Sequence, residues 1–131
     1  MGERVMITGA GSGFGKGSAL ALAARGHEVL ATTETEEQAA ALRAEAPALR
    51  VEKVDITDPA DVARARDWEI DVLINNAGMG ATGPMADVPM DLVRRIFEVN
   101  VFGTLAVSQA VIPGMAARGG GRIVIVSSIA G

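Results

Sequence analysis

Residue types that carry common chemistry are absent or scarce in this sequence. Its 131 residues include no cysteine and a single histidine, His27. Without cysteine the chain forms neither disulfide bonds nor thiolate metal sites, and one imidazole does not build a zinc site, so we expect no metal centre. His27 follows Gly26 at the start of a predicted strand, and we interpret it as a solvated turn residue.

Charge of one sign is not concentrated anywhere in the chain. The formal net charge is −4 and acidic and basic residues are interspersed, which leaves no basic patch for nucleic acid and no surface suited to a membrane. We expect no apolar run of membrane-spanning length. The first predicted strand begins at Arg4, which leaves no room for a signal peptide, so we expect a cytoplasmic protein.

What the sequence does contain is a regular alternation of strand and helix patterns. Hydrophobic residues make up 49% of the chain, enough for the core of one domain over residues 1–131. The alternation predicts an α/β fold in which helices cover both faces of a parallel sheet. We expect strands at 4–8, 28–32, 49–54, 71–74 and 122–127, and helices at 13–25, 34–46 and 90–117, besides a short helix capped by Thr57 or Asp58. The last helix is interrupted near Asn100 and Gly103.

A glycine-dense turn follows the first predicted strand and precedes the first predicted helix. It reads Thr8-Gly9-Ala10-Gly11-Ser12-Gly13-Phe14-Gly15-Lys16. Glycine permits positive φ angles and close approach to the backbone, and a helix N-terminus adds free N–H groups and a partial positive charge. The turn therefore suits a phosphate group. The alternative is a plain strand-to-helix turn that uses glycine only for tightness.

The spacing of these glycines separates the known phosphate-binding patterns. A Walker-A loop fails because Ala10 stands at its first glycine position and Gly17 at its hydroxyl position. The dinucleotide pattern G-x-G-x-x-G fails because Phe14 stands where its third glycine belongs. The pattern that fits is Thr8-Gly9, three further residues, and then Gly13-x-Gly15.

Polar groups follow each of the predicted strands. They are Thr8 to Gly15, Thr33-Glu34, Asp55-Ile56, Asn75 to Gly78, and Ser127-Ser128. Each has a plain structural alternative as a helix start, a turn or a cap. Because ligands of doubly wound sheets bind at the carboxyl ends of the strands, their coincidence predicts one shared site.

Several of these motifs, in this order, resemble the short-chain dehydrogenase/reductase family. They are Thr8-Gly9-x-x-x-Gly13-x-Gly15, Asn75-Asn76-Ala77-Gly78, Val99-Asn100-Val101-Phe102-Gly103, and Gly121-Arg122-Ile123-Val124 running into Ser127-Ser128-Ile129-Ala130-Gly131. The resemblance implies a Rossmann-type sheet, of which this chain supplies about five strands. It also implies hydride transfer between a nicotinamide cofactor and an alcohol or carbonyl substrate, and assembly as a homodimer or homotetramer, to which the helix over 101–117 would contribute.

The same resemblance implies roles for individual residues. The diphosphate would lie against the glycine turn, the adenine against Asp55 and Ile56, and the ribose and nicotinamide against the segment after the fourth strand. Ser128, with Ser127 as the alternative, would be the catalytic serine, and Asn100 would hold a helix kink and a water in the proton relay. The implied cofactor-binding residues are Gly9, Gly11, Ser12, Gly13, Phe14, Gly15, Thr33, Glu34, Asp55, Ile56, Asn76, Ala77 and Gly78.

The family's proton donor is a tyrosine that follows the serine, with a lysine shortly after it. This sequence has no tyrosine, and its only lysines, Lys16 and Lys53, lie far upstream. We therefore expect the 131 residues alone to be inactive, and the alternative function is a non-catalytic nucleotide-binding module. The apolar run 123–126 is typical of a strand buried on both faces, so we expect the native protein to continue beyond Gly131.

The residues near the expected adenosine ribose favour NAD over NADP. Selection for a 2′-phosphate uses a basic residue, whereas this chain has Ser12, Thr33 and Glu34 at the relevant positions. Glu34 lies about twenty residues beyond the glycine turn, where an acid accepts from a ribose hydroxyl. The family's usual aspartate aligns with Thr33, however, so the alternative is that Glu34 only caps the next helix.

Overall fold

A five-stranded parallel sheet forms the centre of the molecule. The computed structural model describes residues 2–129, and its strand order is β3-β2-β1-β4-β5 with every pair parallel. The α/β fold predicted from the sequence is confirmed. The strands are β1 (Arg4–Ile7), β2 (Glu28–Thr33), β3 (Arg50–Lys53), β4 (Val72–Asn75) and β5 (Arg122–Ile125).

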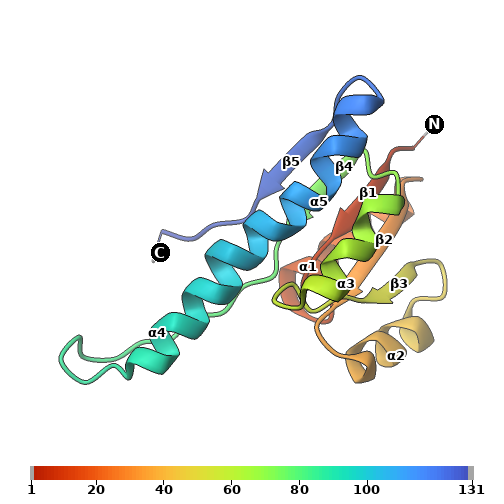
Figure 1. Cartoon of the computed structure of the whole chain (residues 1–131). Coiled ribbons are helices and arrows are strands. Elements are labelled where there is room, and N and C mark those ends of the chain that lie inside the picture. The colour runs from red at the N-terminus through yellow and green to blue at the C-terminus, as the bar shows by residue number, and fades with distance from the viewer. Residues whose placement is uncertain (1, 130–131) are drawn as a thin grey trace.

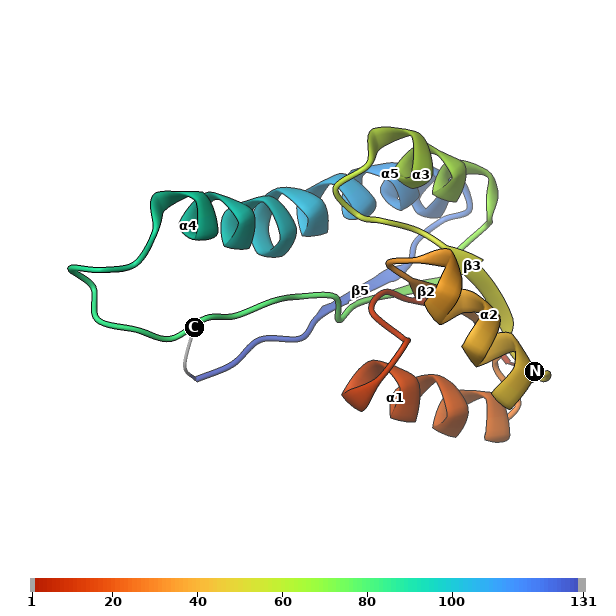
Figure 2. The ribbon, with the colours of Figure 1, turned by 90° about the horizontal axis from the view of Figure 1, so that it is seen from below.

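Helices cover both faces of this sheet (Figure 2). On one face lie α1 (Gly13–Ala24) and α2 (Glu36–Glu45), and on the other α3 (Pro59–Ala63), the short 3₁₀ helix η1 (Arg64–Asp67) and α5 (Thr104–Ala117). The two-residue period of the strands divides the core accordingly. Met6 and Leu73 pack with Val107 of α5, whereas Val5 and Ile7 belong to the cluster on the side of α1 and α2.

The long helix predicted over 90–117 is present and interrupted where expected. It consists of α4 (Met90–Phe97), the π-helical segment η2 (Glu98–Gly103) and α5. Figure 1 shows α4 extending beyond the sheet, toward the loop that precedes it. A wider helical turn of this kind is often found at functional sites.

By length and composition alone, the continuous helix Met90–Ala117 is sufficient to cross a membrane. The expectation that no apolar segment reaches that length is therefore wrong. Core helices of globular domains meet the same criterion, and this helix places Val107, Val111 and Met115 in the core beneath the sheet.

Two local expectations need correction. Thr35 caps α2, since its Oγ1 accepts from the Gln38 N–H at 3.2 Å and the Gln38 side chain accepts from the Thr35 N–H at 3.3 Å, so Glu34 is not the cap. His27 is half-buried and not a solvated turn residue, because its Nδ1 accepts from the Glu3 N–H at 3.1 Å. The short helix α3 is capped by Asp58, one of the two predicted candidates.

Strand β5 is not buried on both faces within the described part of the chain. It lies at the edge of the sheet beside β4, and each of its residues is exposed, with Ile125 reaching 62%. The apolar sequence therefore predicts a buried environment that residues 2–129 do not provide.

Candidate functional site

A cleft opens at the carboxyl ends of the strands and brings together most of the predicted site residues. Its volume is about 230 Å³, below the roughly 300–1,000 Å³ of typical ligand pockets, so it encloses only part of a ligand as large as a dinucleotide. Its wall contains Gly9, Gly11, Ser12, Glu34, Gln38, Val54, Asp55, Ile56, Thr57, Asn76, Ala77, Gly78, Met79, Arg95 and Val99.

Some predicted residues lie outside this wall. Gly13 and Gly15 begin α1 beside the cleft, and Phe14 between them is 86% exposed. Thr33 is buried and donates from its hydroxyl to the Thr35 carbonyl at 2.9 Å. Ser128 lies in the exposed segment after β5, and the last two residues of its motif, 130–131, lie outside the described residues.

The glycine turn is built for close packing. Gly9 has a φ of +65°, and a Cβ there would lie 2.7 Å from the Cα of Ala77. A Cβ on Gly15 would collide with the Gly9 carbonyl oxygen and with the Asn76 side chain. Gly9 and Gly15 are therefore required because neighbouring groups occupy the space of a side chain, and not only because the turn is tight.

The start of α1 presents a positively polarised helix end beside the cleft. Ser12 is the N-cap, its side chain makes no capping hydrogen bond, and the first turn of the helix contains no acidic residue. Lys16 does not serve the turn, since its Nζ pairs with Glu45 at 2.6 Å. The backbone N–H groups and the helix dipole thus supply the attraction for an anion.

Side chains tie the ends of β1 and β4 together under this turn. The Thr8 hydroxyl oxygen accepts from the backbone N–H groups of Asn76 and Ala77, each at 3.0 Å. The Asn76 amide donates to the carbonyls of Thr8 at 3.2 Å and Gly9 at 3.1 Å. The structure therefore adds a role for Asn76: its side chain holds the glycine turn in place.

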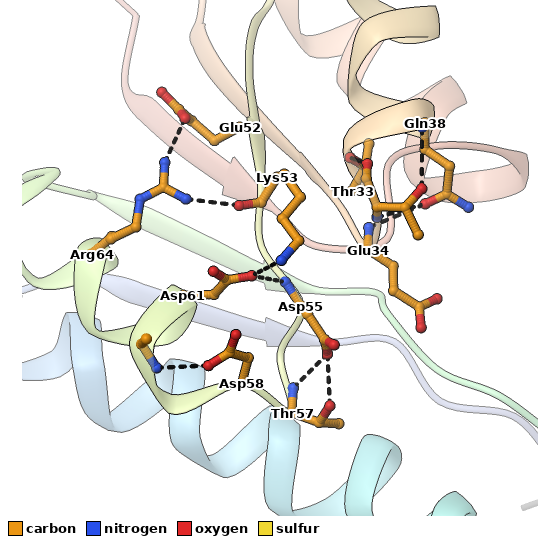
Figure 3. Close-up of polar contacts among 12 residues, drawn as sticks. Thr33, Glu34, Gln38, Glu52, Lys53, Asp55, Thr57, Asp58, Asp61 and Arg64 are labelled. Atoms are coloured by element: carbon orange, nitrogen blue, oxygen red, sulfur yellow. Dashed lines mark hydrogen bonds and ion pairs between the residues drawn. The ribbon is translucent and has the colours of Figure 1, made fainter.

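The turn after β3 is held by a cluster of charged and polar groups (Figure 3). The Asp55 carboxylate accepts from the N–H and the hydroxyl of Thr57, at 2.9 and 2.7 Å. The Asp55 N–H donates to Asp61 at 2.9 Å, and Asp61 also pairs with the Lys53 ammonium at 2.6 Å. These contacts fix the backbone from which Asp55 and Ile56 face the cleft.

The pKa of Asp61 reflects this arrangement. Burial alone would raise the pKa of its carboxyl, but the Lys53 ammonium and the Asp55 N–H together hold that pKa below its ordinary value. The carboxylate is therefore charged at neutral pH. The charged form makes both contacts that order the turn.

Asn100 lies in η2 and binds the chain that follows β4. Its Oδ1 accepts from the Met79 N–H at 2.8 Å, and its Nδ2 donates to the Met79 carbonyl at 2.7 Å. The helix irregularity at Asn100 is confirmed. Its role in a proton relay stays a prediction.

Six wall residues were not among the site residues predicted from the sequence: Gln38, Val54, Thr57, Met79, Arg95 and Val99. The pattern Thr35-x-x-Gln38 is a capping box and would have placed Gln38 beside Glu34. Val99 directly precedes Asn100. Arg95 carries no sequence signal, because its place in the wall depends on how α4 extends over the cleft.

Comparison with known proteins gives consistent matches. A family model described as short chain dehydrogenase matches residues 3–131. The chain is 40% identical to 2-keto-3-deoxy-L-fuconate dehydrogenase of Xanthomonas campestris, over 98% of this chain and 44% of that protein. It spans about half the length of the curated relatives it matches.

Two solved structures are similar in fold. One is the closed form of serine dehydrogenase complexed with NADP⁺, with a TM-score of 0.89 and 29% identity, covering 98% of this chain and 55% of that one. The other is 7α-hydroxysteroid dehydrogenase complexed with NADH and a 7-oxo bile acid, with a TM-score of 0.86 and 34% identity, covering 98% and 54%.

Proposed function

Because the chain belongs to the short-chain dehydrogenase/reductase family, we propose that it forms the nucleotide-binding part of an oxidoreductase. The reaction is hydride transfer between a nicotinamide dinucleotide and a small alcohol or carbonyl compound. The observation that carries the proposal is the cleft in which the glycine turn, Asp55, Ile56 and Gly78 meet. The related structures with NADP⁺ and NADH support the cofactor class.

The residues present fit such a cofactor. The N-terminus of α1 and the glycine turn would bind the diphosphate, because they offer backbone N–H groups and no competing carboxylate. Ile56 and Val99 supply apolar wall for the adenine, and the Asp55 turn borders it. Gly78 and Met79 would border the nicotinamide half, where the bound cofactor supplies or accepts the hydride.

Glu34 supports a preference for NAD over NADP. Its carboxylate lies in the wall of the cleft, and the structure removes the competing explanation that it caps α2. A carboxylate accepts hydrogen bonds from a ribose hydroxyl and repels a phosphate at the same position. NAD is therefore the proposed cofactor.

Catalysis needs groups beyond this cleft. Hydride transfer to a carbonyl builds negative charge on oxygen, so a donor must face that oxygen and an acid must supply a proton. Ser128 is the proposed donor, and Asn100 is proposed to order the relay from η2. The family's tyrosine and lysine have no counterpart after Ser128 in these 131 residues, so the chain alone is proposed to be inactive.

The second candidate is a nucleotide-binding module without catalysis, which the same cleft supports equally. The two candidates predict the same NADH binding and differ in turnover. The full-length protein should therefore be titrated with NADH and then assayed with a panel of ketones and alcohols. Binding with turnover supports the oxidoreductase, and binding without turnover supports the module. Failure to bind either NADH or NADPH contradicts both.

Assembly and location belong to the same proposal. The exposed apolar residues of α4, η2 and α5 support a homodimer or homotetramer. A cytoplasmic location is part of the same proposal. No part of the proposal requires a nucleic acid or a membrane.

A further inference from the structure

Arg95 is the one cationic residue among the described residues that form the wall of the cleft. It belongs to α4, the helix that extends beyond the sheet in Figure 1, whereas the acidic residue opposite it, Glu34, follows β2. The two charges therefore come from elements far apart in sequence and meet across the cleft. None of the binding or catalytic roles proposed above involves Arg95.

The contact between the two side chains is specific but loose. Arg95 Nη2 lies 3.6 Å from Glu34 Oε1, and Arg95 Nη1 lies 3.5 Å from the Thr57 hydroxyl oxygen. The side chains are 45% and 62% exposed. In Figure 3 the Glu34 side chain points away from Thr33 and Gln38, so its carboxylate is not used by the capping contacts of α2. Exposed pairs of this kind are weak and exchange partners readily.

The chemistry of the pair matches the two forms of adenosine ribose. A carboxylate accepts from a 2′-hydroxyl, and a guanidinium binds a phosphate through two parallel N–H groups. The other charged wall residue, Asp55, has its carboxylate engaged by Thr57. A 2′-phosphate entering beside Glu34 thus has one cation available to it.

We propose that Arg95 is a specificity-determining residue that narrows the discrimination between NAD and NADP. When the ribose carries a 2′-hydroxyl, the Arg95 guanidinium pairs with the Glu34 carboxylate. When the ribose carries a 2′-phosphate, the guanidinium leaves Glu34 and pairs with the phosphate. The site then prefers NADH but also binds NADPH. This inference rests on the proposed dinucleotide function of the cleft.

The test uses the full-length protein and compares dissociation constants for NADH and NADPH by fluorescence titration. Arg95→Met should weaken NADPH binding by about tenfold more than NADH binding, because a charge-assisted contact is lost with only one of them. Arg94→Met is the matched control, since Arg94 lies on the same helix, pairs with Asp91 and is not in the cleft wall. It should leave the NADH to NADPH ratio unchanged.

Glu34→Gln and the double variant complete the cycle. Glu34→Gln should shift the ratio toward NADPH, and adding Arg95→Met should remove most of that shift. The inference is overturned if wild-type protein binds NADH but no NADPH, or if Arg95→Met changes the ratio no more than Arg94→Met does. If wild-type protein binds neither dinucleotide, the proposed function itself fails. Thermal unfolding of each variant checks that the fold is intact.

Discussion

Gly15 and Gly17 lie two residues apart in α1, yet a side chain would meet different surroundings at each. A Cβ on Gly15 would collide with the Gly9 carbonyl and the Asn76 side chain, whereas a Cβ on Gly17 has nothing within 4 Å. The neighbours of Gly15 are themselves fixed by hydrogen bonds at the base of the cleft. The spacing of the glycine pattern thus follows from packing between β1 and β4.

Substitution at these two glycines should have opposite effects. Gly15→Ala should destabilise the protein by about 1–3 kcal/mol through overpacking and should abolish NADH binding. Gly17→Ala should stabilise the protein by up to about 1 kcal/mol, because alanine has a higher helix propensity than glycine at an exposed helix position. Urea unfolding and NADH titration check both variants. Equal behaviour of the two would contradict the packing described for Gly15.

The contribution of Asp61 to the turn at Asp55, which borders the proposed adenine site, can be tested by varying the pH. Its pKa is depressed in the folded state, so its ion pair stabilises the protein above the unfolded carboxyl pKa of about 3.9. That contribution is lost as the pH falls through the lower folded value. Asp61→Asn should therefore cost about 1–3 kcal/mol at pH 7, and the difference from wild type should shrink as the solution is acidified toward pH 2.5.

The measurement is urea unfolding of wild type and Asp61→Asn at several pH values, with Asp87→Asn in the exposed loop before α4 as the control. The control should parallel wild type at every pH. A penalty for Asp61→Asn that stays constant down to pH 2.5 would show that the charge of Asp61 is not responsible. NADH binding at pH 7 should weaken in Asp61→Asn alone, because the Asp55 turn loses its support.

At the scale of elements, η2 is the part of the long helix that packs against the wall of the cleft. Gly103 ends η2, and a Cβ there would lie 2.7 Å from the Ile56 side chain, which lines the cleft. The wider turn and the missing side chain together leave space for Ile56. An irregularity in a helix on one side of the sheet thus shapes the surface offered to a ligand.

Gly103→Ala should consequently affect both binding and stability. A Cβ at position 103 would meet Cγ1 and Cδ1 of the buried Ile56 side chain, so the protein should be destabilised by about 1–3 kcal/mol and the dissociation constant for NADH should rise several-fold. Gly114→Ala on the same helix meets only the end of the Arg118 side chain and should leave binding unchanged. Titration and thermal unfolding separate these outcomes. Unchanged NADH affinity in Gly103→Ala would contradict the link between η2 and the cleft.

The helices and strands could be predicted from the sequence better than the contacts between them. Apolar runs indicated the strands, and a long helical pattern with Asn100 and Gly103 within it indicated the last helix and its interruption, because each of these signals lies within a single segment. β5 has the apolar sequence of a strand buried on both faces but is an exposed edge in residues 2–129, since exposure depends on what packs against a strand. Arg95 could not be identified as a site residue from the sequence, because it reaches the wall of the cleft only through the direction in which α4 runs.

At the scale of the molecule, the long helix exposes a surface of large apolar side chains. Phe97, Val101, Phe102, Leu105 and Ile112 are each between 44% and 55% exposed in the described chain. Contiguous apolar surface of this kind marks an interaction site on proteins. It supports the proposed homo-oligomer.

Phe102→Glu should shift the full-length protein toward monomer, because a charge would be buried at the contact. Light scattering coupled to size-exclusion chromatography measures the mass of each species. Leu20→Glu on α1, which is 40% exposed on the opposite face of the sheet, is the control and should leave the mass unchanged. A wild-type protein that is monomeric at high concentration would contradict the proposed assembly.

The pair of hydrogen bonds between Asn100 and Met79 has a consequence for how such a protein diversifies. Asn100 satisfies both peptide groups of Met79, as a neighbouring strand would, at the point where the chain leaves the sheet. Residues before this clamp are held at the wall of the cleft, while the exposed loop from 80 to 89 beyond it can lengthen, shorten or change composition. Under the proposed function, changes in that loop would alter the preference for a substrate and leave the proposed dinucleotide site unchanged.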